Sequence, residues 1–511
     1  MTIGGSMKLA QLLGSVSGAR VTGDSDIEIA GLHYDSRQVR PGGLFFALRG
    51  VQSDGSLFVA AAVKGGAVAV VADRPCAVAG VTVVQVPDAR RAMSLMASLF
   101  YGEPSAAIPV VGITGTNGKT TTSYLIEGIL EAAGIPAAVL GTISYRFGAT
   151  SIPAPNTTPE SVDLQKILRE LVDLGARGAV MEVSSHSLEQ RRADGCLFDV
   201  AVFTNLTRDH LDYHHDMASY FGSKLRLFTD LLAPSPAKPQ RVAVVNLDDP
   251  YGREIAAAAS APVLGYAMEG GAELTVAEVA FSVHGIRCRL STPRGELALA
   301  SDLLGRFNLY NILAAVGTGL ALGLPDAAIR AGIEGHKKVP GRLERVENSK
   351  GITVLVDYAH TGDALENVLT TLSELRSGRI ITIFGCGGDR DKGKRPVMGE
   401  IAARYSDLAV LTSDNPRTEE PQAILEDVRA GIVPLALREY GLDELARGFR
   451  EKGFAVIESR REAVRAAILA AEPGDIVLLA GKGHEDYQII GSEKFHFDDR
   501  EEAAAALALR G

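Results

Sequence analysis

The sequence predicts an α/β protein of three domains, and two observations support this prediction. Short β-branched runs alternate along the 511 residues with longer Ala- and Leu-rich segments of helical period, which is typical of parallel sheets covered by helices. Glycine and proline interrupt the alternation twice, near residues 101–109 and 335–341. Because the length exceeds what one hydrophobic core supports, we expect domains over residues 1–105, 106–336 and 337–511.

The composition is that of a globular protein and argues against several classes. Hydrophobic residues make up 46% and charged residues 22% of the chain, which does not fit a disordered or fibrous protein. The net charge of -10 argues against binding to nucleic acid or to an anionic membrane surface. No stretch reaches the roughly 20 apolar residues of a spanning helix. We therefore expect a soluble cytoplasmic protein with no nucleic-acid partner and no membrane insertion. A monomer is predicted separately, because the composition does not determine the oligomeric state.

The four cysteines lie far apart and include no Cys-x-x-Cys pair. This spacing provides no metal site and fits a reducing compartment. We expect reduced thiols at Cys76, Cys196, Cys288 and Cys386.

Polar residues follow several predicted strands at the point where each strand ends. In the central domain, residues 115–121, 184–186, 205–210 and 248–249 follow strands 108–113, 179–183, 200–204 and 241–246. In the C-terminal domain, residues 357–360, 385–390, 413–417 and 481–485 follow strands 352–356, 380–384, 408–412 and 476–480. Because ligands bind beyond the carboxyl ends of parallel strands, we expect one polar rim in each of these domains.

A glycine-rich loop joins the first central strand to a helix and ends in Gly118-Lys119-Thr120. In such a loop the backbone N–H groups and the helix N-terminus hold phosphates, the lysine reaches the terminal phosphate, and the threonine hydroxyl binds Mg²⁺. The spacing departs from the strict motif, because Ile113 stands where the first glycine is expected and Gly112 is one residue early. The alternative is a glycine-rich turn with a chance Gly-Lys-Thr, which the strand-loop-helix setting disfavours.

Two further groups are suited to a metal that bridges phosphates, because such a metal prefers hard ligands. Glu182 ends the second central strand and is the candidate carboxylate; the alternative is a carboxylate that caps a helix or loop. Among the histidines of residues 207–215, His210 is nearest to a strand end and is the functional candidate. We expect His214 and His215 to be surface residues.

Several motifs together resemble the Mur ligase family, and the resemblance covers almost the whole chain. They are Thr114-Gly115-Thr116-Asn117-Gly118-Lys119-Thr120-Thr121, Glu182 with Ser184-Ser185-His186, Thr204-Asn205-Leu206, Asp209-His210-Leu211-Asp212, residues 305–311, Pro340-Gly341-Arg342, Asp357-Tyr358-Ala359-His360, residues 387–391 and Asp414-Asn415-Pro416-Arg417. Gly362 departs from the family pattern, which usually has proline there, and we expect a softer turn. The resemblance implies a P-loop-type central domain with a parallel sheet, a Rossmann-like C-terminal domain and a smaller N-terminal α/β domain that binds UDP.

The resemblance implies an ATP-dependent ligase that forms an amide through an acyl phosphate. A free carboxylate is a poor electrophile, so phosphorylation supplies a leaving group, and the protein neutralises charge and positions the reactants. The implied ATP-binding residues are Gly115, Thr116, Asn117, Gly118, Lys119, Thr120, Thr121, Asn308, Arg342 and Asp357. The implied Mg²⁺ ligands are Thr120, Glu182, His210 and Lys224 as a carbamate, and the implied catalytic residues are Lys119, Lys224 and His210.

Lys224 lies in residues 217–228, whose spacing predicts an amphipathic helix. Taken alone, a lysine on such a helix is a solvated charge. The resemblance implies instead a lysine carbamylated by CO₂. That modification requires a neutral amine, hence a partly buried lysine with a lowered pKa, and it creates an anion that coordinates Mg²⁺.

The resemblance also implies a UDP-muramoyl dipeptide as the carboxylate substrate, for a role in peptidoglycan synthesis. In the N-terminal domain it rests on residues 34–37 and 41–47, although Asp-Ser-Arg by itself is only a turn signal. The implied contacts are Ser36, Asn156, Thr157, Thr158, Ser184, Gln190 and Arg192. Without the resemblance, Arg192 is equally well explained as a solvated arginine.

The segment Asp414-Asn415-Pro416-Arg417 indicates which amino acid supplies the attacking amine. The resemblance implies meso-diaminopimelate, which has one carboxylate more than lysine, and an arginine fork holds a carboxylate bidentately. The implied contacts are Arg390, Asp414, Asn415, Pro416, Arg417, Gly481 and Glu485, with Glu485 facing the distal ammonium. The alternative for the segment is a plain turn after a strand.

Two other kinds of protein fit parts of the pattern. One is a different ligase of the same superfamily, MurF or a folate polyglutamate synthase. Arg417 and the Asp-Ser-Arg motif of the N-terminal domain weigh against the folate enzyme. The other is a nucleotide-dependent switch, which would hydrolyse ATP without any amine.

Overall fold

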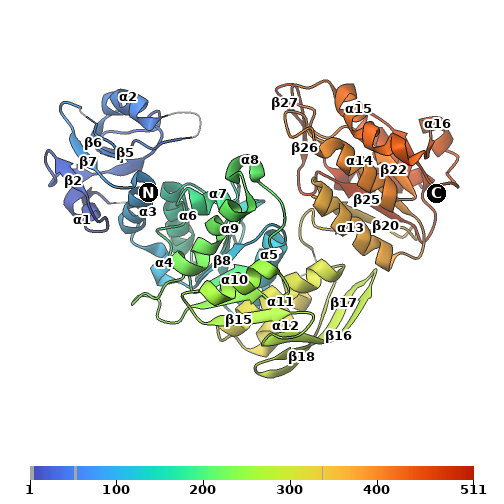
Figure 1. The fold of residues 1–511 in the computed structure, drawn as a ribbon, viewed down its shortest axis with the longest axis horizontal. Coiled ribbons are helices and arrows are strands. Elements are labelled where there is room, and N and C mark those ends of the chain that lie inside the picture. Colours follow the sequence, from blue (N-terminus) through green and yellow to red (C-terminus); the bar gives the residue numbers. More distant parts are fainter. Residues whose placement is uncertain (1–4, 51–53, 77, 336–337, 511) are drawn as a thin grey trace. The chain divides into compact units, whose positions relative to one another are not determined.

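The computed structural model describes residues 5–50, 54–76, 78–335 and 338–510 (Figure 1). Within them the chain forms two compact units. The first contains the chain up to Ala277 together with Arg289–Ala298 and Tyr310–Gly335. The second contains Glu278–Cys288, Leu299–Leu309 and the C-terminal residues from 338 onward. Both units are built from helices and largely parallel sheets, which confirms the predicted α/β class, whereas the domain boundaries at residues 105 and 336 remain predictions.

The N-terminal part of the first unit is a small sheet with helices against it. Among the described residues its strand order is β2 (Arg20–Thr22), β7 (Thr82–Gln85), β6 (Ala67–Ala72), β5 (Gly43–Phe46) and β4 (Gly31–His33). Its helices are α1 (Leu9–Leu13), α2 (Val59–Lys64) and α3 (Ala89–Phe100), and β1 (Met7–Lys8) pairs separately with β3 (Glu28–Ile29). Val162 of helix α6 (Ser161–Asp173) shares the hydrophobic core of this part, so the N-terminal sheet and the central helices pack together.

The large central sheet carries the phosphate loop. Over the described residues its order is β11 (Thr150–Pro153), β10 (Ser144–Phe147), β9 (Ala137–Leu140), β12 (Gly178–Glu182), β8 (Val110–Thr114), β13 (Val200–Phe203), β14 (Val242–Asn246), β15 (Val263–Ala267), β16 (Leu274–Ser282), β17 (Gly285–Thr292) and β18 (Gly295–Ser301). The strands from β9 through β16 are parallel in this order. The four predicted strands are confirmed as β8, β12, β13 and β14, which are neighbours, so their polar ends share one rim as expected.

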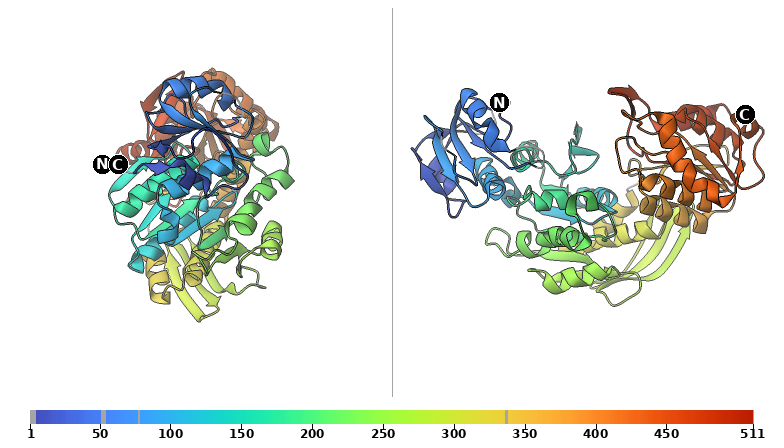
Figure 2. Two further views of the ribbon diagram at one scale, coloured as in Figure 1. Left: turned by 90° about the vertical axis from the view of Figure 1, so that its left-hand side faces the viewer. Right: turned by 45° about the horizontal axis from the view of Figure 1, so that its top comes forward.

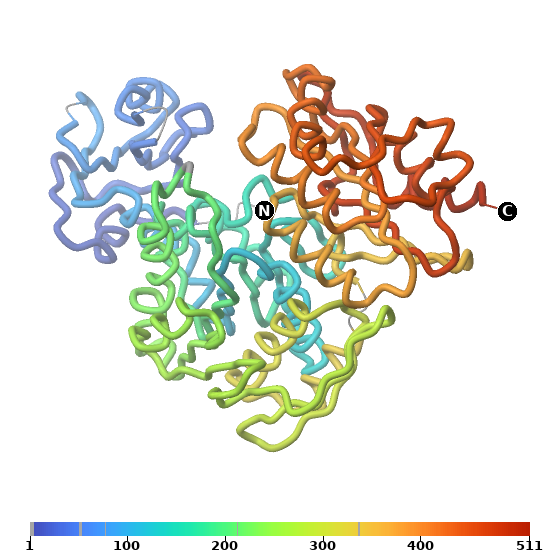
Figure 3. Tube along the Cα trace, turned by 45° about the vertical axis from the view of Figure 1, so that its right-hand side comes forward, coloured from blue at the N-terminus to red at the C-terminus, as the bar shows by residue number. Residues whose placement is uncertain are grey.

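The central helices flank this sheet, and the last three strands extend it. The helices are α4 (Pro104–Ala107), α5 (Lys119–Ala132), α6, α7 (Ser185–Glu189), α8 (Leu211–His214), α9 (Met217–Arg226), α10 (Pro250–Ala258), α11 (Arg306–Ala321) and α12 (Asp326–Gly335). Strands β16 and β17 run side by side as the long yellow-green traces of Figure 3.

The C-terminal sheet belongs to the second unit. Its order over the described residues is β19 (Glu344–Val346), β20 (Thr353–Asp357), β25 (Ile476–Ala480), β21 (Ile380–Phe384), β22 (Leu408–Leu411), β24 (Gly453–Val456) and β23 (Arg438–Glu439). All neighbours after β19 are parallel. The predicted strands are confirmed as β20, β21, β22 and β25, which again lie next to one another and share a rim. A hairpin of β26 (Tyr487–Ile490) and β27 (Glu493–His496) follows β25.

Two hydrophobic cores sandwich the C-terminal sheet. Helices α13 (Gly362–Leu375), α14 (Lys394–Tyr405) and α15 (Pro421–Ile432) contribute to one core, and they lie side by side along one face of the sheet (Figures 1 and 2). Helices α16 (Leu442–Leu445), α17 (Arg460–Ala470) and α18 (Asp499–Ala508) contribute to the other. Gly362 is the first residue of α13, so the expected softer turn is wrong: Thr361 caps the helix by accepting from the Ala364 N–H. The first helical position also suits the proline usual in the family.

Two global expectations concern the membrane and the thiols. In the part of the chain that the structure describes, no helix is both long and apolar enough to span a bilayer. The four cysteines are free, and burial raises the pKa of Cys196, Cys288 and Cys386 to about 12.

A buried ion pair between α17 and α18 provides a stability test. Arg460 Nε and Nη2 donate to the Asp499 carboxylate at 2.8 and 2.6 Å, and both side chains are fully buried. We expect Asp499→Ala to lower the free energy of unfolding of the second unit by about 3–5 kcal/mol, because it leaves a buried charge unpaired. Urea unfolding of each variant measures the change in the free energy of unfolding. The control is Glu502→Ala on the same two helices, whose partner Arg461 has a 67% exposed side chain, and it should change stability little. Equal effects of the two substitutions would contradict the prediction.

Candidate active site

The phosphate loop connects β8 to α5 and requires glycine at two positions. Gly115 has φ +149°, and a Cβ there would lie 1.9 Å from Thr204 Oγ1. Gly118 has φ +86°, and a Cβ there would lie 2.3 Å from Asn311 Oδ1. The loop therefore packs directly on the end of β13 and on α11, which leaves no room for a side chain.

Hydrogen bonds from neighbouring segments fix the backbone of this loop. Thr204 Oγ1 donates to Asn117 O at 2.7 Å, and Asn117 N donates to Asn205 Oδ1 at 3.0 Å. Lys119 Nζ donates to Gly115 O and Thr116 O, both at 2.9 Å. The loop is thus preformed, and its lysine lies over it at the N-terminus of a helix of 14 residues, the geometry that favours phosphate.

The candidate metal carboxylate Glu182 is buried at the end of β12 beside the loop. It accepts from Thr120 Oγ1 at 3.1 Å, from Thr142 Oγ1 at 2.9 Å and from Thr142 N at 3.0 Å. Glu182 therefore joins the loop helix α5 to the loop after β9. It does not cap a helix, whereas its bond from Thr142 N agrees with the loop-capping alternative. A hydroxyl and a carboxylate in contact are two hard oxygen donors, so the pair fits Mg²⁺ bound to phosphates.

Lys224 lies on α9, and its side chain reaches the phosphate loop. The residue is only 1% exposed, its Nζ donates to Gly115 O at 2.8 Å, and it lies 4.6 Å above the Tyr220 ring. Burial, together with the nearby charge of Lys119, moves the pKa of Lys224 well below its usual value. The solvated alternative is therefore wrong. The predicted helix ends at Arg226 and continues as a π-helical turn over Leu227–Leu231.

The histidines around α8 differ from expectation in one case. His210 is exposed, has a positive φ of 56° and packs edge-on against His186 with 4.9 Å between ring centroids. His214, which we expected at the surface, is buried, because α8 packs it between α7 and α9. Its Nε2 lies 2.9 Å from Ser185 Oγ and its Nδ1 lies 3.5 Å from Ser223 Oγ. His215 is exposed as expected.

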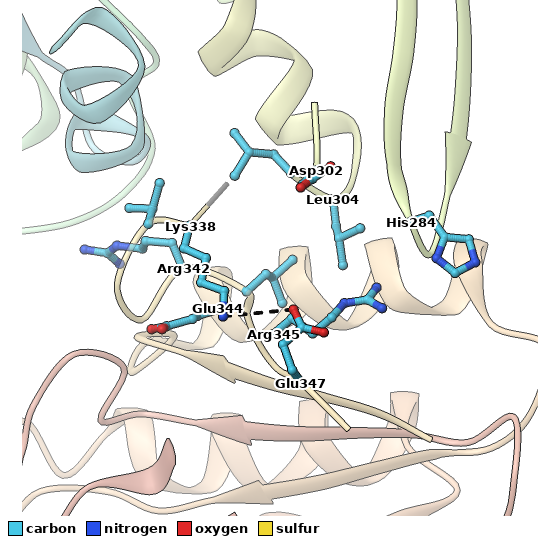
Figure 4. A pocket seen from close by; sticks show the side chains of 11 residues that line it. His284, Asp302, Leu304, Lys338, Arg342, Glu344, Arg345 and Glu347 are labelled. Atoms are coloured by element: carbon cyan, nitrogen blue, oxygen red, sulfur yellow. Dashed lines mark ion pairs between the residues drawn. The ribbon is translucent and has the colours of Figure 1, made fainter. Parts of the chain in front are cut away.

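The predicted nucleotide residues outside the phosphate loop all belong to the second unit. Asn308 Nδ2 donates to Leu304 O at 2.9 Å. The buried Asp357 carboxylate accepts from Leu343 N and Ala359 N at 2.7 and 2.8 Å, and burial raises its pKa. Arg342 lies 5.0 Å from the Tyr358 ring centroid and lines a cavity of about 240 Å³ (Figure 4). This cavity is lined by His284, Asp302, Leu303, Leu304, Lys338, Val339, Arg342, Leu343, Glu344, Arg345 and Glu347.

Most of the predicted UDP-substrate contacts gather beside Glu182 in the first unit. Thr158 Oγ1 donates to Glu182 O at 2.8 Å and accepts from Ser184 N at 3.2 Å. Arg192 Nη1 donates to Thr158 O at 3.0 Å, and its Nη2 donates to Gln190 Oε1 at 2.8 Å.

The Arg192 side chain is mostly buried and pairs with Glu160 at 2.8 Å, which excludes a solvated arginine. Thr157 Oγ1 lies 3.2 Å from Thr142 Oγ1, whereas Asn156 is exposed. Ser36 lies on the N-terminal part, which α6 contacts through the hydrogen bond from Tyr34 to Asp163.

The predicted diaminopimelate residues form a polar cluster at the rim of the C-terminal sheet. Asn415 Nδ2 donates to Glu485 Oε2 at 3.0 Å. Burial and the neighbouring Asp414 raise the pKa of Glu485. A Cβ on Gly481 would lie 3.7 Å from Asp414 Oδ2, so this glycine also faces the cluster. The segment is therefore more than a plain turn after a strand.

Arg417 lies beside this cluster, against the loop after β21. Its backbone has φ 52°, and its Nη1 donates to Gly388 O at 2.7 Å. A Cβ on Gly388 would lie 1.9 Å from Pro416 O, so only glycine allows the two segments to approach this closely. Arg390 is exposed, and its Nη1 donates to Asp389 O at 3.0 Å.

The structure also reveals site residues that the sequence analysis did not select. Thr142 holds Glu182 from the end of β9, Tyr220 lies beneath Lys224 and contacts Thr116, and the buried Lys482 lies among the diaminopimelate candidates. Lys482 lies within residues 481–485, which the rim argument already included without selecting the lysine. Thr142 follows β9, so the rim argument would have found it if extended to that strand end. Tyr220 carries no such signal.

Comparisons with known proteins agree with this geometry. Three family models match the chain: the Mur ligase middle domain over residues 113–319, the Mur ligase glutamate ligase domain over residues 341–483, and the Mur ligase family catalytic domain over residues 28–101. A UDP-N-acetylmuramoyl-L-alanyl-D-glutamate--2,6-diaminopimelate ligase of Geobacter metallireducens is 64% identical, covering 98% of each chain. The enzyme of that name from Gloeobacter violaceus is 47% identical, covering 99% of each chain.

Solved structures give the same result. A structure titled as a UDP-N-acetylmuramoyl-L-alanyl-D-glutamate--2,6-diaminopimelate ligase has a TM-score of 0.72 at 33% identity and covers 99% of each chain. MurF ligase from Thermotoga maritima in complex with ADP has a TM-score of 0.60 at 17% identity, with 94% of this chain and 98% of that chain covered, and therefore supports the fold alone. From the matched domains, the full-length relatives and the preformed phosphate loop, we conclude that the chain belongs to the Mur ligase family.

Proposed function

We propose that this chain is an ATP-dependent ligase that joins meso-2,6-diaminopimelate to UDP-N-acetylmuramoyl-L-alanyl-D-glutamate in peptidoglycan synthesis. The observation that carries the specificity is the position of the Arg417 cation beside the cluster of Asp414, Asn415 and Glu485. A cation beside a carboxylate complements the zwitterionic distal end of diaminopimelate, whereas lysine has no distal carboxylate. The full-length relatives that bear this enzyme's name support the same substrates.

The first step activates the substrate carboxylate. A carboxylate oxygen attacks the γ-phosphorus of ATP, the bond to the bridging oxygen breaks, and ADP leaves. The loop N–H groups, Lys119 and the N-terminus of α5 stabilise the charge that develops on the phosphoryl group. Residues Thr157, Thr158, Ser184, Gln190 and Arg192 are proposed to hold the UDP-linked dipeptide, with Ser36 and Asn156 as further contacts.

In the second step the amine nitrogen attacks the acyl phosphate carbon. The C–O bond to phosphate breaks, a proton leaves the nitrogen, and amide and phosphate are released. The proposed amino-acid contacts Arg390, Asp414, Asn415, Pro416, Arg417, Gly481 and Glu485 place that nitrogen. The proposed nucleotide contacts in the second unit are Asn308, Arg342 and Asp357.

We propose that Thr120 and Glu182 hold Mg²⁺, with His210 as a further ligand. The ion would supply positive charge to the phosphates and to the developing transition state. The amine of Lys224 would repel a cation if protonated, but its burial favours the neutral form, which CO₂ converts to a carbamate by forming an N–C bond and releasing a proton. The carbamate oxygens then suit the same ion.

The compartment follows from the proposed chemistry. ATP and a nucleotide-linked precursor are compounds of the cytoplasm, where the four free thiols also stay reduced. We therefore propose that the enzyme acts in the cytoplasm, and its action as a monomer stays a prediction.

An acceptor screen tests the proposal. The chain is incubated with ATP and the UDP-linked dipeptide, and each of diaminopimelate, lysine and glutamate is offered in turn. Amide formation with diaminopimelate, accompanied by equal phosphate release, is expected. Preference for lysine or for glutamate would contradict the proposed amino-acid specificity, and phosphate release without any amine would indicate a nucleotide-dependent switch.

Lys224→Ala should reduce kcat by on the order of 10³-fold, because it removes a charged group from the reacting phosphates. Lys224→Glu should recover part of the activity, since it returns an anion to that position. Initial rates give the comparison, and ¹³C-bicarbonate labelling followed by NMR detects the carbamate in the unaltered chain. Normal turnover of the alanine variant would exclude the role.

Arg417→Ala should lower kcat/KM for diaminopimelate by on the order of 100- to 1,000-fold, because the distal carboxylate loses its charged partner. The kcat/KM for lysine should change much less than the kcat/KM for diaminopimelate. The control is Arg404→Ala, an exposed arginine on α14 that pairs with Glu400 on the same helix. An unchanged preference between diaminopimelate and lysine would refute the assignment of Arg417.

A further inference from the structure

One buried lysine joins the segments that carry the proposed amino-acid contacts. Lys482 is fully buried, and its Nζ donates to Tyr487 O at 2.6 Å and to Asn415 Oδ1 at 3.3 Å. The same Nζ lies 3.2 Å from Asp414 Oδ1 and 3.8 Å from Glu485 Oε2. The turn after β25, the segment after β22 and strand β26 therefore meet at a single ammonium group.

The orientation of the Asn415 amide depends on this lysine. Asn415 Oδ1 accepts from Lys482 Nζ and, at 2.9 Å, from Ile489 N. Since both neighbours are donors, the oxygen must face them, and the Nδ2 group is directed to Glu485 Oε2. A rotated amide would place its own N–H groups against two donors. Lys482 thus helps to decide which way a proposed substrate contact points.

The charge of Lys482 also sets the net charge of the pocket. Asp414 and Glu485 bring two negative charges into a largely buried cluster, and Lys482 compensates one of them. The remaining negative charge and the positive charge of Arg417 match the ammonium and carboxylate of an amino-acid end. Without the lysine, two neighbouring buried carboxylates would repel each other, and one would take up a proton.

We propose that Lys482 is a positioning residue for the amino-acid substrate, which neutralises Asp414 and orients Asn415 so that Glu485 stays ionised toward the substrate ammonium. This inference rests on the proposed function, because it assigns the pocket to the incoming amine. It differs from a purely structural role, in which Lys482 would only hold three segments together.

Lys482→Met removes the charge while keeping an unbranched side chain that is one atom shorter. The KM for the amino acid should rise by about tenfold or more, while the KM values for ATP and for the UDP-linked dipeptide stay within about twofold. The matched control is Lys494→Met on the hairpin strand β27, an exposed lysine that lies 3.4 Å from the Tyr487 ring centroid, and it should leave all three values unchanged. Thermal unfolding is recorded for each variant.

A pH series separates positioning from structure. The titratable groups that interact with Glu485 are Asp414, Lys482, Arg417, Arg460, Tyr358 and Tyr487. Among them Lys482 lowers the pKa of Glu485, so its removal raises that pKa further, and the carboxyl is neutral over more of the acidic range. The ratio of the variant's KM to the unaltered KM should therefore fall as the pH rises from about 6.5 to about 8.5. A structural defect would give a ratio independent of pH.

Lys482→Gln is measured alongside, so that the result does not depend on one variant being well folded, and the same selective, pH-dependent rise is expected. Unchanged KM for the amino acid, or an equal loss for all substrates at every pH, would overturn the proposal. Both variants are assayed with whichever amino acid the unaltered chain accepts. Rejection of diaminopimelate by the unaltered chain would therefore count against the proposed function and would still leave Lys482 tested.

Discussion

The parallel direction of neighbouring strands is the constraint on which both rims depend. In the order of the central sheet, the strands from β9 to β16 all end on the same edge, and so do the strands from β20 to β23 in the order of the C-terminal sheet. Since several of these strand ends are followed by polar residues, side chains far apart in the chain are brought together there. Thr120 and Glu182, separated by 62 positions, share a hydrogen bond for this reason.

The cost of burying a charged side chain is the second constraint, and the two rims reduce this cost in different ways. In the first unit Lys224 is buried against a backbone carbonyl, where neutralising the amine reduces the desolvation cost. In the second unit the Lys482 ammonium lies beside the carboxylates of Asp414 and Glu485. Their opposite charges compensate the cost of burying the ammonium. The first arrangement suits a reactive amine, and the second suits a fixed recognition surface.

Much of the fold and of the site was predictable from the sequence, because the signals are local. A β-branched run that ends in polar residues identifies a strand and its rim residues. The predicted first and last residues of all eight strands lie within two residues of the observed ones. The phosphate loop was predictable from its glycines and Gly-Lys-Thr. His214 was not, since its burial depends on two serines contributed by separate helices, and Gly362 was mistaken because the capping role of Thr361 outweighs the flexibility of glycine.

By itself the sequence determined the α/β class, the order of strands and loops, and the residue types that reach each rim. Only the tertiary structure decided which of these side chains are buried, and in what charge environment: Lys224 on the Gly115 carbonyl, Arg192 against Glu160, Lys482 between Asp414 and Glu485. The physical reason is that desolvation and charge compensation are set by neighbours from distant segments, which no local periodicity specifies.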